Sequence, residues 1–169
     1  AAATGLELWP IELPHPCSDE QYRAAMGEAM ERAQAAGIDG VAFGDLYLED
    51  VRRYRVDRMA GTGIEPLFPL WKLDTTALAK EMQAAGLRAR ITCVDPKQID
   101  VGFAGREWDA DLVAELPEGA DPCGENGEFH TFVHAGPMFA AAIPITAGEV
   151  VNRDGFEFAD VLPANDETP

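Results

Sequence analysis

The chain has 169 residues, is 47% hydrophobic and carries a formal net charge of −17 at pH 7. Nucleic-acid binding depends on Lys and Arg side chains that neutralise phosphates, so this excess of acidic residues argues against DNA or RNA as a partner. No run approaches the roughly 20 apolar residues of a membrane span, and the first ten residues do not resemble a secretory signal, so we expect a cytoplasmic protein without a membrane partner.

The first predicted elements alternate between helix and strand. Ser18 and Gln21 have the spacing of a helix capping box, and apolar residues then recur at helical spacing up to Gly37. The expected buried stripe of this helix consists of Tyr22, Ala25, Met26, Ala29, Met30 and Ala33. Residues 38–43 (IDGVAF) predict a short strand, and a second helix is expected from about Leu48. This order is typical of an α/β sheet, in which ligands bind beyond the carboxyl ends of the strands.

A basic segment follows the first predicted strand. The sequence VRRYRVDR (51–58) contributes Arg52, Arg53, Arg55 and Arg58 to a chain with 13 basic residues in total. Gly44 and Asp45 precede this segment and come directly after the strand, where an α/β sheet places its ligand, so one interpretation is a site for a small phosphorylated ligand. The other interpretation is a helix that exposes its arginines to water, which is the commoner case for a run of charge.

The segment EPLFPLW (65–71) holds two prolines among large apolar residues, which favours a crossing connection and a domain boundary. The elements expected beyond it are a capped helix from Asp74 or Thr75 to Ala85, a strand over 87–94 with Leu87, Ala89, Ile91 and Cys93 on one face, a short acidic helix over 108–116, and a hairpin within 141–162 around the turn NRDG. The last residues, 163–169, are typical of a disordered tail.

The sequence PCGENGEFHTF (122–132) gathers several groups that could take part in catalysis. If residues 128–133 form a strand, alternation places Glu128, His130 and Phe132 on one face, and Gly124 and Gly127 allow a sharp turn before it. Glu and His are the usual general acids and bases, so such a set could orient a substrate and move a proton. A polar loop without a function is the alternative interpretation.

The three cysteines do not point to a metal site or a disulfide framework. Cys17, Cys93 and Cys123 are far apart and form no CxxC pair, so we expect reduced thiols. The spacing of Cys123, His130 and His134 matches no strong zinc pattern. Cys123 is better interpreted as a small packed side chain than as a nucleophile, because spacing alone assigns it no partner base.

Four segments in order carry a resemblance to a known family: FGDLYLEDVRRYR (43–55), PLFPLWKLDT (66–75), FAGREWDADLV (103–113) and DPCGENGEFHTFVHAGPMF (121–139). They resemble the diphthine–ammonia ligase family of the PP-loop ATP pyrophosphatases, in particular its bacterial branch, over about residues 5–139. The resemblance implies an α/β fold. Residues 1–70 would be part of a PP-loop nucleotide-binding domain of the Rossmann-like, adenine nucleotide alpha-hydrolase type, with a parallel sheet. Residues 71–169 would form a smaller α+β substrate-binding domain.

The resemblance also implies a reaction and its participants. A substrate carboxylate, small or protein-borne, would be adenylated by ATP with Mg²⁺, and ammonia would then displace AMP. The implied site residues are Gly44, Asp45, Arg52 and Arg55 for the nucleotide, Glu125, Asn126, Gly127 and Thr131 for the substrate, and Glu128 and His130 for catalysis. No resident metal is implied, and a homo-oligomer is compatible with the sequence.

Two features depart from the family pattern. The amidating branch reads Glu-Gly-Gly-Glu-(Phe or Tyr)-Glu, whereas Asn126 and His130 occupy the second and last positions here, so we expect an acid other than diphthine. The family also begins with a strand and a Ser-Gly-Gly-Lys-Asp-Ser loop that cradles the pyrophosphate of ATP. That loop does not occur in this sequence, so we expect the sequence to open inside the first domain and the chain alone to be inactive. A non-catalytic module that binds a small ligand, and an ATP pyrophosphatase without ligation, are the alternatives.

Overall fold

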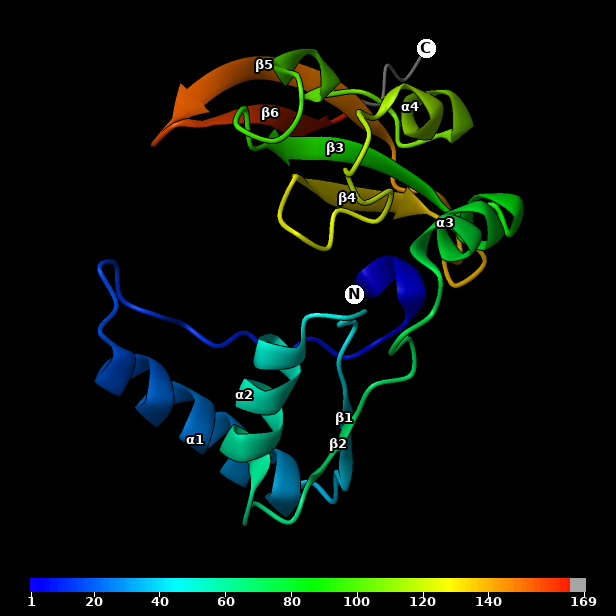
Figure 1. Cartoon of the computed structure of the whole chain (residues 1–169). Helices are drawn as coiled ribbons and strands as arrows, with labels where there is room; N and C mark the ends of the chain where they lie inside the picture. The colour runs from blue at the N-terminus through cyan, green and yellow to red at the C-terminus, as the bar shows by residue number, and fades with distance from the viewer. Residues whose placement is uncertain (165–169) are drawn as a thin grey trace. The chain divides into compact units, whose positions relative to one another are not determined.

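The computed structural model describes residues 1–164, and the chain divides into two compact units (Figure 1). The first unit is Leu8–Lys72, and the second unit comprises Ala1–Glu7 and the chain from Leu73 onward. The sequence analysis placed residues 1–7 in the first region, but they pack with the second unit, where the Ala140 N–H donates to the Ala3 carbonyl at 2.7 Å.

The first unit contains two helices and a small parallel sheet. Its elements are α1 (Asp19–Ala35), β1 (Gly40–Ala42), α2 (Glu49–Met59) and β2 (Glu65–Leu67). The predicted capping box of α1 is confirmed: the Gln21 N–H donates to Ser18 Oγ at 3.2 Å, and the Ser18 N–H donates to Gln21 Oε1 at 2.9 Å. β1 and β2 pair in parallel, as the α/β fold class requires.

The prediction that residues 65–71 form no regular element is wrong for the first three residues, which form β2. Val41 of β1 lies opposite Pro66 of β2 in the parallel register. Proline cannot donate a backbone hydrogen bond, but it is tolerated on an edge strand, whose outer side has no ladder to complete. β2 is such a strand, because the sheet described for this unit has two strands.

The apolar stripe on α1 is less buried than the sequence predicts. Ala33 is 4% exposed, whereas Tyr22 at the other end of the stripe is 37% exposed and the residues between them are half-buried. The buried cluster of the first unit is correspondingly small and consists of Ala33, Met59 and Ile64. The first unit therefore contains few fully buried apolar side chains for its length.

The second unit is an antiparallel sheet with helices packed against it. Its elements are η1 (Ala2–Thr4), α3 (Thr75–Ala84), β3 (Arg88–Val94), η2 (Val101–Phe103), α4 (Ala110–Glu115), β4 (Phe129–Ala135), β5 (Ile145–Arg153) and β6 (Phe156–Pro163). The strand order is β4-β3-β6-β5. Ile91 and Val94 of β3 lie in one core cluster with Ala79 of α3, Phe103 of η2 and Leu112 of α4. A parallel α/β unit is thus followed by an α+β unit, which confirms the predicted fold class.

The C-terminal elements agree in part with the sequence. β5 and β6 form the predicted hairpin, with Asn152 opposite Glu157 and the turn at Asp154 and Gly155. The predicted tail at 163–169 begins too early, because Pro163 is still part of β6, and residues 165–169 lie outside the described residues. Within residues 1–164, no helix combines the length and the apolar character needed to cross a membrane.

Candidate functional site

The loop before β4, Asp121–Glu128, is organised around the carboxylate of Glu128. The backbone N–H of Asp121 and the side-chain amide of Asn126 donate to Glu128 Oε1 at 2.8 and 2.9 Å, and the backbone N–H of Asn126 donates to Oε2 at 3.0 Å. Glu128 is 2% exposed. A buried carboxylate is costly unless hydrogen-bond donors satisfy it, and here three donors from the loop itself do so. The first role of Glu128 is therefore to close the loop.

Two glycines give this loop its shape. Gly124 and Gly127 have φ angles of 72° and 81°, in the left-handed region where residues with a side chain are strained. Gly124 also lies close to the backbone of β4, because a Cβ at this position would come 2.8 Å from the Phe129 carbonyl oxygen. The predicted sharp turn is confirmed, and position 124 requires glycine for both reasons.

The loop is tied to its own unit at several points. The indole N–H of the buried Trp108 donates to the Pro122 carbonyl at 2.9 Å, and the Asp95 N–H donates to the Glu128 carbonyl at 2.9 Å. Gln98 Nε2 donates to the Asn126 carbonyl at 3.4 Å. The position of the loop is thus fixed by core and backbone contacts from β3 and the segments that follow it.

The expectation that Glu128, His130 and Phe132 share one face is wrong. Glu128 is buried before β4 begins, whereas His130 and Phe132 are exposed. Glu128 precedes the strand whose alternation the prediction assumed, and the loop folds back so that the N–H groups of Asp121 and Asn126 enclose its carboxylate. Glu128 and His130 therefore do not present one acid–base pair.

The predicted substrate residues of this loop are distributed between its surface and its interior. His130, Thr131 and Asn126 are exposed, Glu125 and Gly127 are half-buried, and Glu128 is enclosed. An imidazole, a hydroxyl and an amide are thus available to a ligand at the start of β4. The assignment of these residues to substrate binding stays a prediction.

Cys123 lies in the same loop, but its environment does not favour the reactive thiolate form. It is half-buried against the core of the second unit, and its Sγ lies 3.5 Å from the Thr75 carbonyl oxygen. Burial, with a smaller contribution from the charges of Asp121 and Glu125, raises the pKa of the thiol to about 11. Because the thiolate is the nucleophilic form, this geometry agrees with a packed thiol and not with a nucleophile at neutral pH.

In the first unit, two of the predicted nucleotide residues, Arg52 and Arg55, each lie close to an aromatic ring, and Arg55 also pairs with Asp45, so that charged and aromatic groups form one array. Arg55 donates from Nε to Asp45 Oδ2 at 2.6 Å and from Nη2 to Oδ1 at 3.1 Å, and its guanidinium lies 4.6 Å from the ring centroid of Phe43. Such a two-point ion pair fixes both side chains in one geometry. Asp45 and Arg55 thus lie together, as the sequence suggested, but they use these hydrogen-bonding groups to bind each other.

Arg52 is held differently. Its guanidinium lies 5.0 Å from the ring centroid of Phe68 and 4.9 Å from that of Trp71. Its Nε is buried, and no hydrogen-bond acceptor for it exists within residues 1–164. A buried donor without an acceptor is uncommon in folded proteins and often marks a place that a ligand or an ion completes. For Arg52 and Arg55, the interpretation as a simple solvated charge run is therefore wrong.

Gly44 contributes no close contact to this array. A Cβ built at Gly44 would meet no atom within 4 Å, so the fold itself does not require glycine there. The nearby arginines Arg53 and Arg58 are exposed, unlike Arg52 and Arg55. Any role of Gly44 must therefore come from the open space beside its backbone and not from packing.

A polar cluster around the buried His134 in the second unit was not predicted from the sequence. His134 is 6% exposed, and its Nε2 lies 2.8 Å from Glu107 Oε1. Glu107 also pairs with Arg88 at 3.3 Å and with Arg90 at 3.5 Å. His134 was considered only for its spacing to Cys123 and His130, and no signal in the sequence links it to a carboxylate 27 positions away.

Comparisons with known proteins relate the chain to one family. Residues 74–160 match the model of the diphthamide synthase C-terminal domain, and this range contains the loop around Glu128. The chain is 32% identical to the diphthine–ammonia ligase of Danio rerio over 95% of this chain and 69% of the relative. It is 29% identical to the enzyme of that name from Mus musculus, over 78% of this chain and 57% of the relative. It is 30% identical to the diphthine–ammonia ligase of Homo sapiens, over 73% of this chain and 48% of the relative.

The chain thus spans between about half and 69% of the length of these curated relatives. The matched range of the family model covers more than half of the chain and includes α3, β3, α4 and β4, together with the loop that β4 follows. On this evidence the chain belongs to the diphthine–ammonia ligase family.

Proposed function

We propose that the protein is an ATP-dependent ligase that converts a substrate carboxylate to an amide with ammonia and releases AMP and pyrophosphate. The observation that carries this proposal is the family match over 74–160, because it contains the ordered loop around Glu128 and the exposed groups beside it. The relatives are named as ligases that join diphthine and ammonia. For this chain, we propose the reaction class, amidation of a carboxylate with ammonia, but not diphthine as the acid.

The residues at positions 126 and 130 support an acid other than diphthine. Asn126 donates its side-chain amide to Glu128 Oε1 at 2.9 Å, a contact that a glycine could not make. His130 places an exposed imidazole where the amidating branch has a carboxylate. An acid or amine that is attracted by a negative charge would find less of that charge here. We propose a substrate that carries less positive charge than one suited to the Glu-containing motif.

The first unit offers groups that fit ATP. The Arg52 Nε lacks an acceptor among the described residues, and its guanidinium lies within about 5 Å of the ring centroids of Phe68 and Trp71. Asp45 and Arg55 hold the segment after β1 in one conformation. We propose that Arg52 contacts the phosphates of ATP with Mg²⁺, and that Gly44 leaves room for the nucleotide. ATP would supply the adenylyl group that activates the acid.

The chemistry then assigns different roles to the two residues first paired for catalysis. A carboxylate oxygen of the substrate attacks the α-phosphorus of ATP and pyrophosphate leaves; ammonia attacks the acyl carbon, AMP leaves, and one proton is lost from nitrogen. The exposed imidazole of His130 is the group we propose to accept that proton. Glu128 is a positioning residue in this scheme, because the hydrogen bonds of its carboxylate hold the loop.

The test measures products with the full gene product, ATP, Mg²⁺, ammonium and a panel of carboxylic acids. Formation of AMP, pyrophosphate and an amide in the presence of one acid is the expected result. His130→Gln should lower kcat by about 10²-fold, the scale of a lost general base, with no change in the unfolding midpoint. The matched control is His15→Gln, which replaces an exposed histidine of the first unit. Release of ADP and phosphate in place of AMP and pyrophosphate would contradict the proposal.

A further inference from the structure

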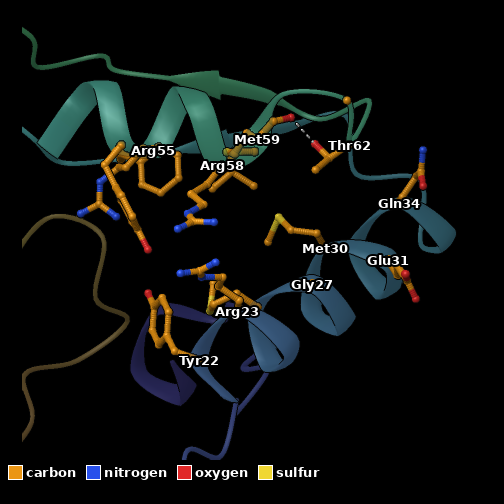
Figure 2. Close-up of a pocket in the computed structure, with 15 residues that line it drawn as sticks. Tyr22, Arg23, Gly27, Met30, Glu31, Gln34, Arg55, Arg58, Met59 and Thr62 are labelled. Carbon is orange, nitrogen blue, oxygen red and sulfur yellow. Dashed lines mark hydrogen bonds between the residues drawn. The ribbon is translucent and has the colours of Figure 1, made fainter. Parts of the chain in front are cut away.

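A cavity of about 550 Å³ lies within the first unit, between α1 and α2 (Figure 2). A volume of this size is typical of small-molecule sites. Much of its wall is apolar or aromatic, with Met26 and Met30 from α1, Tyr54 and Met59 from α2, and Phe43 from β1. The half-buried stripe of α1 therefore faces this space in part, which explains why it is less buried than its sequence pattern predicts.

Two arginines face each other across the cavity. Arg23 on α1 and Arg58 on α2 point their guanidinium groups toward one another, whereas Glu31 is turned away from the space between them (Figure 2). Two like charges that converge repel each other, and an anion between them reverses the sign of the interaction. The arrangement is therefore more favourable with an anion present than without one.

These two arginines differ from the third arginine that lines the cavity. Arg55 is neutralised by its two-point pair with Asp45. Arg23 pairs with Asp19 one turn away, but these side chains are 53% and 62% exposed, so water screens the pair and little stability depends on it. Unlike Arg55, Arg23 and Arg58 are therefore not held in a two-point ion pair with a carboxylate.

Arg58 is the less compensated of the two. Its guanidinium lies 5.1 Å from the ring centroid of Tyr54, and no carboxylate within residues 1–164 forms an ion pair with it. A stacked guanidinium keeps its N–H groups available at the edge of the plane. A cation that points into a cavity and has no carboxylate partner attracts an anionic ligand.

We propose that the cavity between α1 and α2 binds a small oxyanion, a carboxylate or a phosphate, that is carried by an apolar or aromatic body. Arg23 and Arg58 hold the oxyanion from opposite sides, because the planar guanidinium matches both groups with paired N–H donors. The methionines accommodate the body of the ligand, since their unbranched side chains adapt to its shape. This proposal does not rest on the ligase reaction, and its test does not use turnover.

The test titrates the full gene product at low ionic strength with phenyl phosphate, benzoate and inorganic phosphate, and measures binding by calorimetry. The aromatic probes should bind more tightly than inorganic phosphate, and their order tells a phosphate ligand from a carboxylate ligand. Arg23→Gln and Arg58→Gln should each weaken binding about tenfold or more, as expected when a hydrogen bond between charged groups is lost. The matched control is Arg53→Gln on the same helix as Arg58, because Arg53 is exposed and does not line the cavity.

A second measurement needs no variant and so does not depend on how well the variants fold. In the unmodified chain, phenyl phosphate should shift the Nε–Hε resonances of Arg23 and Arg58 and leave that of Arg53 in place. The proposal is overturned if none of the probes binds at millimolar concentration. It is equally overturned if Arg53→Gln weakens binding as much as the cavity variants, or if the shifts occur at other arginines.

Discussion

The two units of this chain are stabilised by different interactions. In the second unit, Ile91, Val94 and Leu112 are each 0% exposed and belong to a continuous core beneath the antiparallel sheet. In the first unit, the buried cluster is small, and the contacts around α2 include the Asp45–Arg55 pair and Arg52 against the rings of Phe68 and Trp71. Each such contact contributes about 0.5–2 kcal/mol, less than a well-buried Leu.

This difference matters for where ligands can bind. In the second unit, the candidate substrate groups lie on one loop and at the start of β4, where a fixed backbone holds them. The loosely packed first unit contains a cavity of about 550 Å³ with charged groups in its wall. The first unit thus has space for a ligand, and the second has precise placement of polar groups.

The largest expected effect is that of Leu112→Ala in the core of the second unit. The side chain is 0% exposed, and its removal leaves a cavity in a close-packed region, so we expect a loss of about 3–5 kcal/mol in the free energy of unfolding. Met59→Ala in the first unit should cost less, about 2 kcal/mol, because Met59 already borders an open space. Native-state hydrogen exchange of backbone amides measures the free energy of opening in each unit separately. Equal losses in the two variants would contradict the comparison.

A smaller effect is expected from Glu128→Gln. Glutamine offers one acceptor oxygen, and its NH₂ group would face an N–H donor of Asp121 or Asn126, so a hydrogen bond is lost and a donor is left unsatisfied. We expect a loss of about 2–3 kcal/mol in the free energy of unfolding, measured with urea. The matched control is Glu118→Gln, an exposed residue that lies just ahead of this loop, which should change stability by less than about 0.5 kcal/mol. Equal stability of Glu128→Gln and wild type would show that the loop does not depend on this charge.

Asp45→Asn tests the contribution of the ion pair in the first unit. Asparagine can accept one hydrogen bond from Arg55 but presents an NH₂ group to the second donor and removes the negative charge. The Asp45 side chain is 11% exposed and that of Arg55 is 35% exposed, so solvent screens the pair in part and we expect a loss of about 1–2 kcal/mol. Hydrogen exchange in α2 is the measurement, with Asp57→Asn on the exposed side of α2 as control. A change of the same size in the control would attribute the effect to helix charge alone.

The features that the sequence predicts well are those with a local cause. The capping box of Ser18 and Gln21 joins residues three positions apart, and the hairpin turn at residues 152–155 depends on its own glycine. The strand predicted over 87–94 is largely confirmed by β3: Ala89, Ile91 and Cys93 are buried as expected, whereas Leu87 is half-buried and precedes the strand. In each of these elements, the pattern that predicts the structure is also the interaction that stabilises it.

The features that the sequence did not predict depend on contacts between distant segments. Alternation placed Glu128 beside His130, but the loop folds back so that the Asp121 N–H reaches the carboxylate before β4 begins. The convergence of Arg23 and Arg58 requires α1 and α2 to face each other across the cavity. Neither interaction leaves a periodic signal, because it depends on backbone geometry that is set elsewhere in the unit.

The smallest expected effect concerns the cysteines, which differ between the units in the same sense as the cores. Cys17 of the first unit is exposed, whereas Cys93 of the second unit is buried and Cys123 is half-buried. Iodoacetamide at pH 8 should therefore alkylate Cys17 first and Cys123 slowly, because alkylation requires an accessible thiolate and the pKa of the Cys123 thiol is raised to about 11. Peptide mass spectrometry over time distinguishes the three sites, and alkylation of Cys123 as fast as Cys17 would contradict the packed arrangement.

The same shift gives a pH dependence whose sign is fixed. The pKa of the Cys123 thiol in the folded chain, about 11, lies above its ordinary value of 9.0, so the folded state retains the proton more strongly than the unfolded state does. This difference is without effect below about pH 9, and it lowers the free energy of unfolding progressively between about pH 9 and 11, where the unfolded thiol ionises and the folded one does not. Cys123→Ala removes the titrating group. The difference in unfolding free energy between wild type and this variant should therefore be constant from pH 6 to 8 and should shift against wild type above pH 9, and a difference that stays constant up to pH 11 would mean that the buried environment of the thiol does not persist in solution.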